Sequence, residues 1–309
     1  MKFVFLFLLS VAVSLGDVFE KGPYSVHPII PGVMRIEDAN RTHPAGVQVD
    51  KNGKQTGFNN CSDMYLIVGG QSALLIDLSN FIKWDDTAVA SLRSIVSQEI
   101  GTKKLHIAFT HFHGDHTGML PAFRDDQNVT FWIQPGEFKG RETFPADRTT
   151  SVATQPTLDL GDGFIVNALE IPGHTDHSTA YFLQGKNLAF TGDGIGSGNG
   201  VWIFSAEGFD KYRKSVDHMI EYIRSPANGI DETKLAFFGG HYWQKREKEK
   251  LTMQYLTDMQ KLIGEMKTGS ARQEAVSFGP YLNANFISGE ATITWNKDDA
   301  RAFVQANAK

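Results

Sequence analysis

The stretch that decides the fold is Thr110–Gly118, with the sequence THFHGDHTG. It places three histidines and one aspartate within the six residues from His111 to His116, directly after the apolar run Leu105–Phe109. Such a dense cluster of a rare residue seldom arises by chance. Because imidazole nitrogens and carboxylate oxygens are the ligands that zinc prefers, the stretch predicts a metal site at the end of a strand.

The spacing within this stretch predicts two neighbouring sets of ligands. Alternate residues such as His111 and His113 project to one side, whereas Asp115 and His116 emerge from the tight turn that follows and point past them. Three further segments, each after an apolar run that predicts a strand, supply the remaining candidates: Gly173–Thr175 (GHT), Thr191–Asp193 (TGD) and Gly239–His241 (GGH).

Composition predicts an ordinary globular protein around this site. The chain has 309 residues, is 41% hydrophobic and carries a formal net charge of -5. A chain of this length buries one large core or two ordinary ones, and no linker divides it, so we expect a single domain over residues 17–309. The modest acidity gives no reason to expect nucleic acid or an acidic membrane as a partner. Cys61 is the only cysteine, which excludes an internal disulfide.

The first residues predict a secretory signal. Lys2 is followed by the apolar run Phe3–Leu9 and the small-residue end Ser14–Gly16. The run is shorter than the roughly 20 residues of a spanning helix, which favours a cleaved signal over residues 1–16 and a secreted protein, or a periplasmic one in a bacterium. Export agrees with three glycosylation sequons, at Asn40, Asn60 and Asn128.

Hydrophobic periodicity predicts alternating strands and helices. We expect a hairpin from Met64–Val68 and Ala73–Ile76, helices over Asp85–Ile100 and from near Gly118, and two longer helices with apolar stripes over Phe209–Ile223 and Leu251–Met266. Further strands are expected at Val129–Ile133, Phe164–Ile171, Ser178–Leu183, Leu188–Thr191 and Leu235–Phe238. The order predicts an α/β protein with two mixed sheets face to face and helices outside.

Over Met64–Tyr242 the chain resembles the metallo-β-lactamase fold superfamily. The resemblance rests on a strand-end Asp77 and on the motifs THFHGDHTG, PGHT, TGD and GGH in this order. It implies a four-layer αββα sandwich with two zinc ions at one edge, although Fe or Mn would suit similar ligands. It also implies that His111, His113 and His174 hold one ion, that Asp115, His116 and His241 hold the other, that Asp193 bridges them and that Asp77 orients the ligand loop.

Asp193 sorts the chain within this superfamily. An aspartate in this place resembles the glyoxalase II, lactonase and ribonuclease Z branches, whereas true β-lactamases have Cys, Ser or another residue there. Ribonuclease Z acts on polyanions and needs basic surface or an added module, which this acidic chain lacks. A flavodiiron oxidase would need a flavin domain, and a persulfide dioxygenase with one iron is a minor alternative.

The resemblance implies a hydrolase in which a hydroxide between two zinc ions attacks a carbonyl carbon. The substrate is then a small molecule, namely a lactone, ester, thioester or amide, and Asp115 is placed to move a proton. Tyr242 would donate to the oxyanion or would simply pack in the interior. Two alternatives stay open: true β-lactamase activity, and a metal-binding scaffold without turnover.

The surrounding loops carry the substrate preference, and the sequence leaves their roles open. Gly194–Gly200 and Val201–Phe204 follow Asp193 directly, so we expect them to border the pocket and to favour an apolar acyl or aromatic substrate. His177 would be a polar wall or a second donor, and Phe81 and Trp84 would cap the cleft or pack at the surface. Two ranges lie outside the family core, 17–60 and 273–309. The first is expected to form an arm over the site or a subunit contact. The oligomeric state is left open.

Overall fold

The computed structural model describes residues 16–38, 62–196, 200–241 and 251–307. The signal predicted for residues 1–16, the sequons at Asn40 and Asn60, Cys61 and Tyr242 therefore lie outside the described residues, apart from Gly16 itself. Among the helices described, none is long and apolar enough to pass through a lipid bilayer.

The first sheet has eight strands in chain order, from β1 to β8. Strands β1 to β5 pair antiparallel and β5 to β8 pair parallel. Their bounds are β1 (Phe19–Lys21), β2 (Tyr24–Ile30), β3 (Val33–Asp38), β4 (Asp63–Val68), β5 (Ser72–Ile76), β6 (Lys104–Ala108), β7 (Val129–Ile133) and β8 (Thr149–Ser151).

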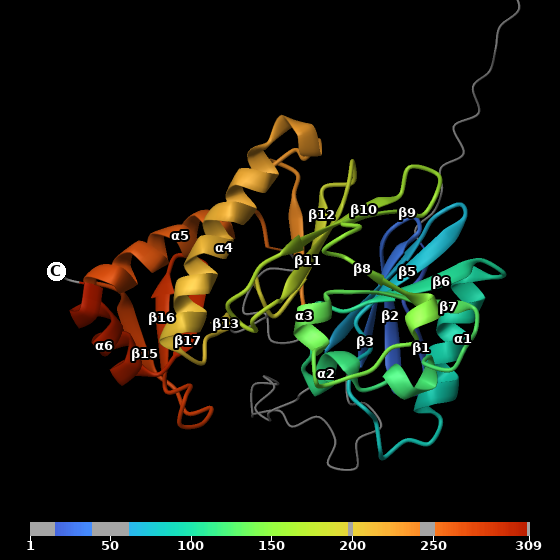
Figure 1. Cartoon of the computed structure of the whole chain (residues 1–309), viewed down its shortest axis with the longest axis horizontal. Coiled ribbons are helices and arrows are strands. Elements are labelled where there is room, and N and C mark those ends of the chain that lie inside the picture. Colours follow the sequence, from blue (N-terminus) through green and yellow to red (C-terminus); the bar gives the residue numbers. More distant parts are fainter. Residues whose placement is uncertain (1–15, 39–61, 197–199, 242–250, 308–309) are drawn as a thin grey trace, which may run out of the picture.

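The central strands of this sheet are apolar on both faces because both faces are covered. In β4, Met64 and Leu66 join the cluster beneath helix α1 (Ala88–Ile100), whereas Tyr65 and Ile67 join the cluster between the two sheets. The sheet is thus the inner layer of a sandwich, with α1 on its outer side (Figure 1).

The second sheet has the strand order β14-β12-β11-β10-β9 and is mixed, since β12 and β14 run parallel. Its strands are β9 (Thr157–Asp159), β10 (Ile165–Glu170), β11 (Thr179–Leu183), β12 (Leu188–Gly192) and β14 (Ala236–Gly239). Inward side chains such as Tyr181 and Phe190 meet the first sheet, and Phe182 and Phe237 contact the core beneath the helices. The predicted sandwich of two mixed sheets is confirmed.

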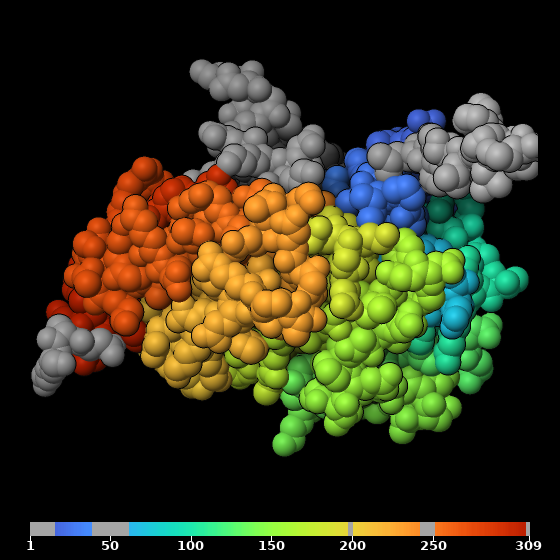
Figure 2. Space-filling model, turned by 90° about the horizontal axis from the view of Figure 1, so that it is seen from above, coloured from blue at the N-terminus to red at the C-terminus, as the bar shows by residue number. Residues whose placement is uncertain are grey.

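A third sheet goes beyond the prediction. It has four strands in the order β13-β17-β16-β15, with bounds β13 (Val201–Trp202), β15 (Arg272–Ala275), β16 (Ala284–Ser288) and β17 (Ala291–Trp295). It lies beside α4 (Ala206–Arg224), α5 (Met253–Thr268) and α6 (Lys297–Asn307) at one end of the molecule (Figure 1). Seen from above, α4 and α5 lie side by side (Figure 2). Residues 273–307, left outside the family core by the sequence, build most of this sheet.

The N-terminal segment also differs from expectation where it is described. Residues 19–38 form β1, β2 and β3 of the first sheet, so this part is not an arm over the site. Tyr24, Val26 and Ile36 are buried in the core beneath α1. A segment that buries such side chains belongs to the sheet.

The predicted helices are confirmed with shifted ends. Helix α4 begins after Ser205, whose side chain accepts a hydrogen bond from the backbone N–H of Gly208, as an N-cap residue does. Helix α5 begins after the N-cap Thr252, so Leu251 lies outside it and pairs with Phe237 in an isolated bridge.

The helix expected near Gly118 starts earlier. Helix α2 covers Gly114–Thr117 and therefore includes part of the histidine stretch, and a 3-10 turn, η1 (Leu120–Ala122), follows it. Three further short elements lie in the described residues: α3 (Pro135–Phe138), η2 (Ala146–Arg148) and η3 (Pro226–Asn228).

Candidate metal centre

The loop after β6 brings two histidines to a third from the opposite sheet. Nε2 of His111 lies 3.0 Å from Nδ1 of His113, and Nε2 of His174 lies 3.1 Å from that same nitrogen. His174 comes from the loop between β10 and β11, in the second sheet. The three residues predicted to hold one ion therefore lie together, and their ligand atoms all fall within 4.8 Å of one another.

A second group lies beside the first. Nε2 of His241 is 3.5 Å from Oδ2 of Asp115, and Nε2 of His116 is 4.0 Å from the same oxygen. Asp115 and His116 project from α2, whereas His241 follows β14. The residues predicted to hold the other ion are thus also assembled within ligand range of one another.

Asp193 lies between the two groups. Its Oδ1 is 3.5 Å from Nε2 of His116, and its Oδ2 is 3.3 Å from Nε2 of His241 and 3.7 Å from Nε2 of His174. The carboxylate therefore faces one histidine of the first group and two of the second. A ligand that bridges two ions has to face both groups in this way.

Asp77, at the end of β5, fixes the orientation of the ligand loop. Its carboxylate accepts hydrogen bonds from the backbone N–H and the hydroxyl of Thr110, each at 2.7 Å. Its Oδ2 also lies 2.9 Å from Nδ1 of His116, which leaves Nε2 of that ring directed into the cluster. His174 is oriented in the same way, since its Nδ1 lies 2.9 Å from the carbonyl oxygen of Trp202. Such partners raise the basicity of a ligand and fix its ring.

Burial keeps the first group neutral. Burial, and then the neighbouring imidazoles, hold the pKa of His111 well below its usual range and lower the pKa of His113 to about 3. Burial also lowers the pKa of His174, against the opposing effect of Asp193. Neutral imidazole is the form that binds a metal ion.

In the second group, neighbouring carboxylates raise the pKa values of the histidines. Burial tends to lower the pKa of His116, but Asp193, Asp77 and Asp115 outweigh it and raise that pKa well above its usual value. The pKa of His241 is raised by Asp193 in the same way, again against burial. The carboxylates around this group thus favour positive charge at its centre, whether as protons or as a cation.

The side chains fit a divalent cation with nitrogen and oxygen ligands. Zinc-to-nitrogen bonds of about 2.0–2.1 Å in a tetrahedron put neighbouring nitrogens about 3.3 Å apart, close to the 3.0 and 3.1 Å separations of the first group. In the second group, Nε2 of His116 is buried and has no hydrogen-bond partner within the described part of the chain. A buried nitrogen that faces carboxylates at 3.5 Å and beyond is a position that a cation would satisfy.

Gly240 allows these side chains to approach the backbone. A Cβ atom at this position would lie 2.4 Å from Oδ1 of Asp193 and 2.6 Å from Cε1 of His116. The glycine before His241 is therefore part of the site, because no other residue leaves room for both neighbours.

Phe204, at the end of the aromatic segment after Asp193, lies beside two of the histidines. The ring of Phe204 is 39% exposed and lies 5.6 Å from the ring of His174 and 6.3 Å from that of His113. Trp202 belongs to β13 of the third sheet and stacks on Phe278, in the loop between β15 and β16, at 5.4 Å.

Of the other candidates, His177 and Trp84 contact residues outside the ligand groups. His177 interacts through Nδ1 with Glu170 at 2.5 Å, both side chains are over 40% exposed, and neither belongs to a ligand group among the described residues. Trp84 packs against the core beneath α1 and so has a packing role, whereas Phe81 is exposed.

Sequence reasoning missed Glu137, a buried acid in α3. Its carboxylate accepts hydrogen bonds from backbone N–H groups on both sides of the first ligand group, at Phe112 and His177. One signal was available: α3 follows β7, the parallel neighbour of β6, and neighbouring parallel strands end at the same edge of a sheet.

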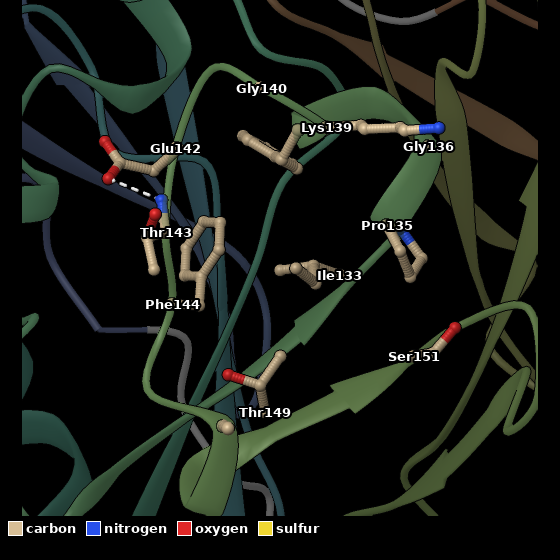
Figure 3. A pocket seen from close by; sticks show the side chains of 12 residues that line it. Ile133, Pro135, Gly136, Lys139, Gly140, Glu142, Thr143, Phe144, Thr149 and Ser151 are labelled. Carbon is tan, nitrogen blue, oxygen red and sulfur yellow. Dashed lines mark hydrogen bonds between the residues drawn. The ribbon is translucent and has the colours of Figure 1, made fainter.

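A groove of about 600 Å³ lies beside α3 (Figure 3). Its described lining includes Ile133, Pro135, Phe138 and Phe144 but none of the seven predicted ligands. It is therefore a feature separate from the cluster of histidines and aspartates.

This geometry agrees with a comparison against known families. A family model described as the metallo-beta-lactamase superfamily matches residues 62–223, which is over half of the chain. The chain belongs to the metallo-beta-lactamase superfamily.

Three curated relatives with similar sequences come from fungi. The lactamase-like protein nscB of Trichophyton rubrum is 28% identical over 72% of this chain, and nscB of Arthroderma benhamiae is 29% identical over 72%. The chain spans 64% and 47% of the lengths of these two proteins. The atrochrysone carboxyl ACP thioesterase of Aspergillus fumigatus is 30% identical over 55% of this chain and 39% of its own length.

Solved structures share the fold. A metallo-beta-lactamase of Pseudomonas aeruginosa in its mono-zinc form has a TM-score of 0.51 at 15% identity, covering 79% of this chain and 96% of that one. A metallo-beta-lactamase from Erythrobacter litoralis has a TM-score of 0.53 at 17% identity, covering 81% and 100%. The predicted fold class is confirmed by this likeness.

Proposed function

We propose that this protein is a hydrolase that uses two zinc ions to cleave a carbonyl compound. The observation that carries the proposal is the position of Asp193, within 3.3 to 3.7 Å of histidine nitrogens from both ligand groups. A carboxylate shared in this way would hold two cations side by side. Zinc ions bound there would activate water near neutral pH and polarise a carbonyl group.

The predicted site residues would bind the metal ions and transfer a proton. His111, His113 and His174 would hold one ion, and Asp115, His116 and His241 would hold the other together with Asp193. Asp115 is partly exposed, with 12% of its side chain accessible, and faces His241 at 3.5 Å. In this proposal it would accept a proton from the attacking water and pass it to the leaving group.

We propose a thioester with an apolar or aromatic acyl group as the substrate. Two features support this choice over a lactone, ester or amide: a relative is named an atrochrysone carboxyl ACP thioesterase, and Phe204 presents an exposed ring beside His174 and His113. An exposed aromatic ring next to the reactive centre favours apolar surface on the bound substrate.

The test is a panel of matched substrates on the zinc-loaded protein. We expect hydrolysis of benzoyl and hexanoyl thioesters to exceed that of the corresponding esters and of a cephalosporin. Phe204→Ala should raise KM for the benzoyl thioester about tenfold, and change KM for the acetyl thioester less, because only the larger group meets the ring. Turnover of the cephalosporin alone would favour β-lactamase activity instead. No turnover of any member, with two zinc ions bound, would favour the metal-binding scaffold.

We also propose that the protein is exported, on the charge and hydropathy pattern of residues 1–16. Sequencing the N-terminus of protein from the culture medium tests this, since a mature protein that begins at Met1 would contradict it.

A further inference from the structure

Glu137 lies where the two loops of the first ligand group meet. Its Oε1 accepts a hydrogen bond of 2.9 Å from the backbone N–H of Phe112, the residue between His111 and His113. Its Oε2 accepts a hydrogen bond of 3.1 Å from the backbone N–H of His177, three residues after His174. One carboxylate therefore connects both loops.

The two loops belong to different sheets. The first follows β6 of the eight-stranded sheet, and the second joins β10 to β11 of the five-stranded sheet. A backbone hydrogen bond of 2.8 Å from Thr179 to Thr110 ties them at their base. Nearer to the imidazoles, Glu137 connects the two loops.

The surroundings of Glu137 fix its carboxylate in place. The residue is 4% exposed, and α3 starts with Pro135, a residue suited to the first turn of a helix. Gly136 packs against the ring of His177, since a Cβ atom there would lie 2.7 Å from Nε2. A buried acceptor that takes two N–H groups has few alternative positions, because any move would leave a buried donor without a partner.

We propose that Glu137 is a positioning residue that sets the separation of the His113 and His174 imidazoles and so prepares the first ligand group for its cation. This inference rests on the proposed metal centre. The carboxylate binds the backbone of the two loops and acts through it.

The experiment compares Glu137→Gln with Glu170→Gln in the full-length, zinc-loaded protein. The two acids form a matched pair because both contact the loop after His174, Glu137 at the buried backbone N–H of His177 and Glu170 at its exposed ring. Glu137→Gln keeps the size of the side chain and replaces one acceptor oxygen by a donor. Glu137→Asp, which keeps both acceptors on a shorter side chain, serves as a partial rescue.

The readouts are zinc affinity by chelator competition, the visible absorption spectrum of the cobalt-substituted protein, and kcat and KM measured separately. We expect Glu137→Gln to weaken binding of one zinc ion about 10 to 100-fold and to alter the cobalt spectrum. Glu137→Asp should fall between Glu137→Gln and the unaltered protein, and Glu170→Gln should stay within about twofold of the unaltered protein.

Two results would overturn the inference. One is a Glu137→Gln protein that unfolds more easily but keeps its zinc affinity and cobalt spectrum, which would make the residue merely structural. The other is an equal loss in Glu170→Gln. If Glu137→Gln does not fold, the same readouts on Glu137→Asp decide. An unaltered protein that binds no metal would instead contradict the proposed function itself.

Discussion

Single residues decide how closely the ligand side chains approach one another. Asp77 has a backbone φ of 62°, in the left-handed region, at the point where β5 ends and its carboxylate turns toward Thr110 and His116. Aspartate tolerates this conformation better than most residues. The strand end is thus shaped to present one carboxylate to the ligand loop.

Asp193→Ala tests the shared carboxylate. We expect zinc content and kcat/KM to fall together, with kcat/KM reduced about 100-fold or more, because both groups lose a ligand. Metal analysis and steady-state kinetics on the same preparation measure this. A variant with full activity would remove the argument that separates this protein from the true β-lactamases.

Gly240→Ala tests the space beside the cluster. The new methyl group would meet Asp193 and His116 at 2.4 and 2.6 Å, so we expect loss of at least one zinc ion in a protein that still folds. Gly264→Ala is the control, since nothing lies within 4 Å of a Cβ atom there and alanine favours its helix. Equal zinc content in the two variants would show that the site relaxes around the methyl group.

At the scale of elements, the long periodic segments could be predicted from sequence and the short ones could not. Helix α4 buries the predicted stripe from Phe209 to Ile223, because a helix of 19 residues repeats its pattern several times. Helices α2 and α3 have four residues each, too few for a pattern. Both lie at the candidate metal site. Glu137 could not be predicted because α3 is too short to show a hydrophobic pattern.

The pair β6 and β7 carries a pH-dependent contribution to stability. His106 of β6 faces Thr130 of β7 in register, and its Nδ1 lies 2.7 Å from the threonine hydroxyl. Burial, with a smaller effect of Lys104, lowers the pKa of His106 from 6.5 to about 4. Between these values the unfolded chain binds a proton that the folded chain does not, so this contribution is lost as the pH falls from 6.5 toward about 4.

We expect that loss to reach at most about 2 kcal/mol between pH of about 7 and about 5. Urea unfolding of the unaltered protein and of His106→Gln at both pH values measures it, because the variant cannot titrate at this position. The unaltered protein should lose more stability than the variant on acidification. Equal losses would place the pH dependence in other groups.

At the scale of the whole molecule, the candidate centre joins the two sheets of the sandwich. His111, His113, Asp115 and His116 follow a strand of the first sheet, whereas His174, Asp193 and His241 follow strands of the second. A bound cation would cross-link the two layers at their common edge.

Removal of metal should therefore destabilise the whole fold. Ligand binding to the native state alone adds about 4 kcal/mol when the free metal is about 1,000 times its dissociation constant. We expect chelator treatment to lower the midpoint of urea unfolding clearly, and added zinc, but not magnesium, to restore it. Unchanged midpoints would show that the sheets are held together without metal.

The sequence by itself determined the candidate metal ligands and the layers of the fold. The dense cluster from His111 to His116 and the later His174, Asp193 and His241 all occupy strand ends, and alternating apolar runs predicted the two mixed sheets. Such signals are local, since residue type and spacing along one segment suffice to read them.

Only the tertiary structure decided which strand ends meet and what holds them. It placed residues 19–38 in the first sheet, built a third sheet from residues after 200, and brought Glu137 between two loops that are distant from each other in the chain. These are contacts between distant segments, and no local pattern records them, because each depends on how the sheets pack against each other.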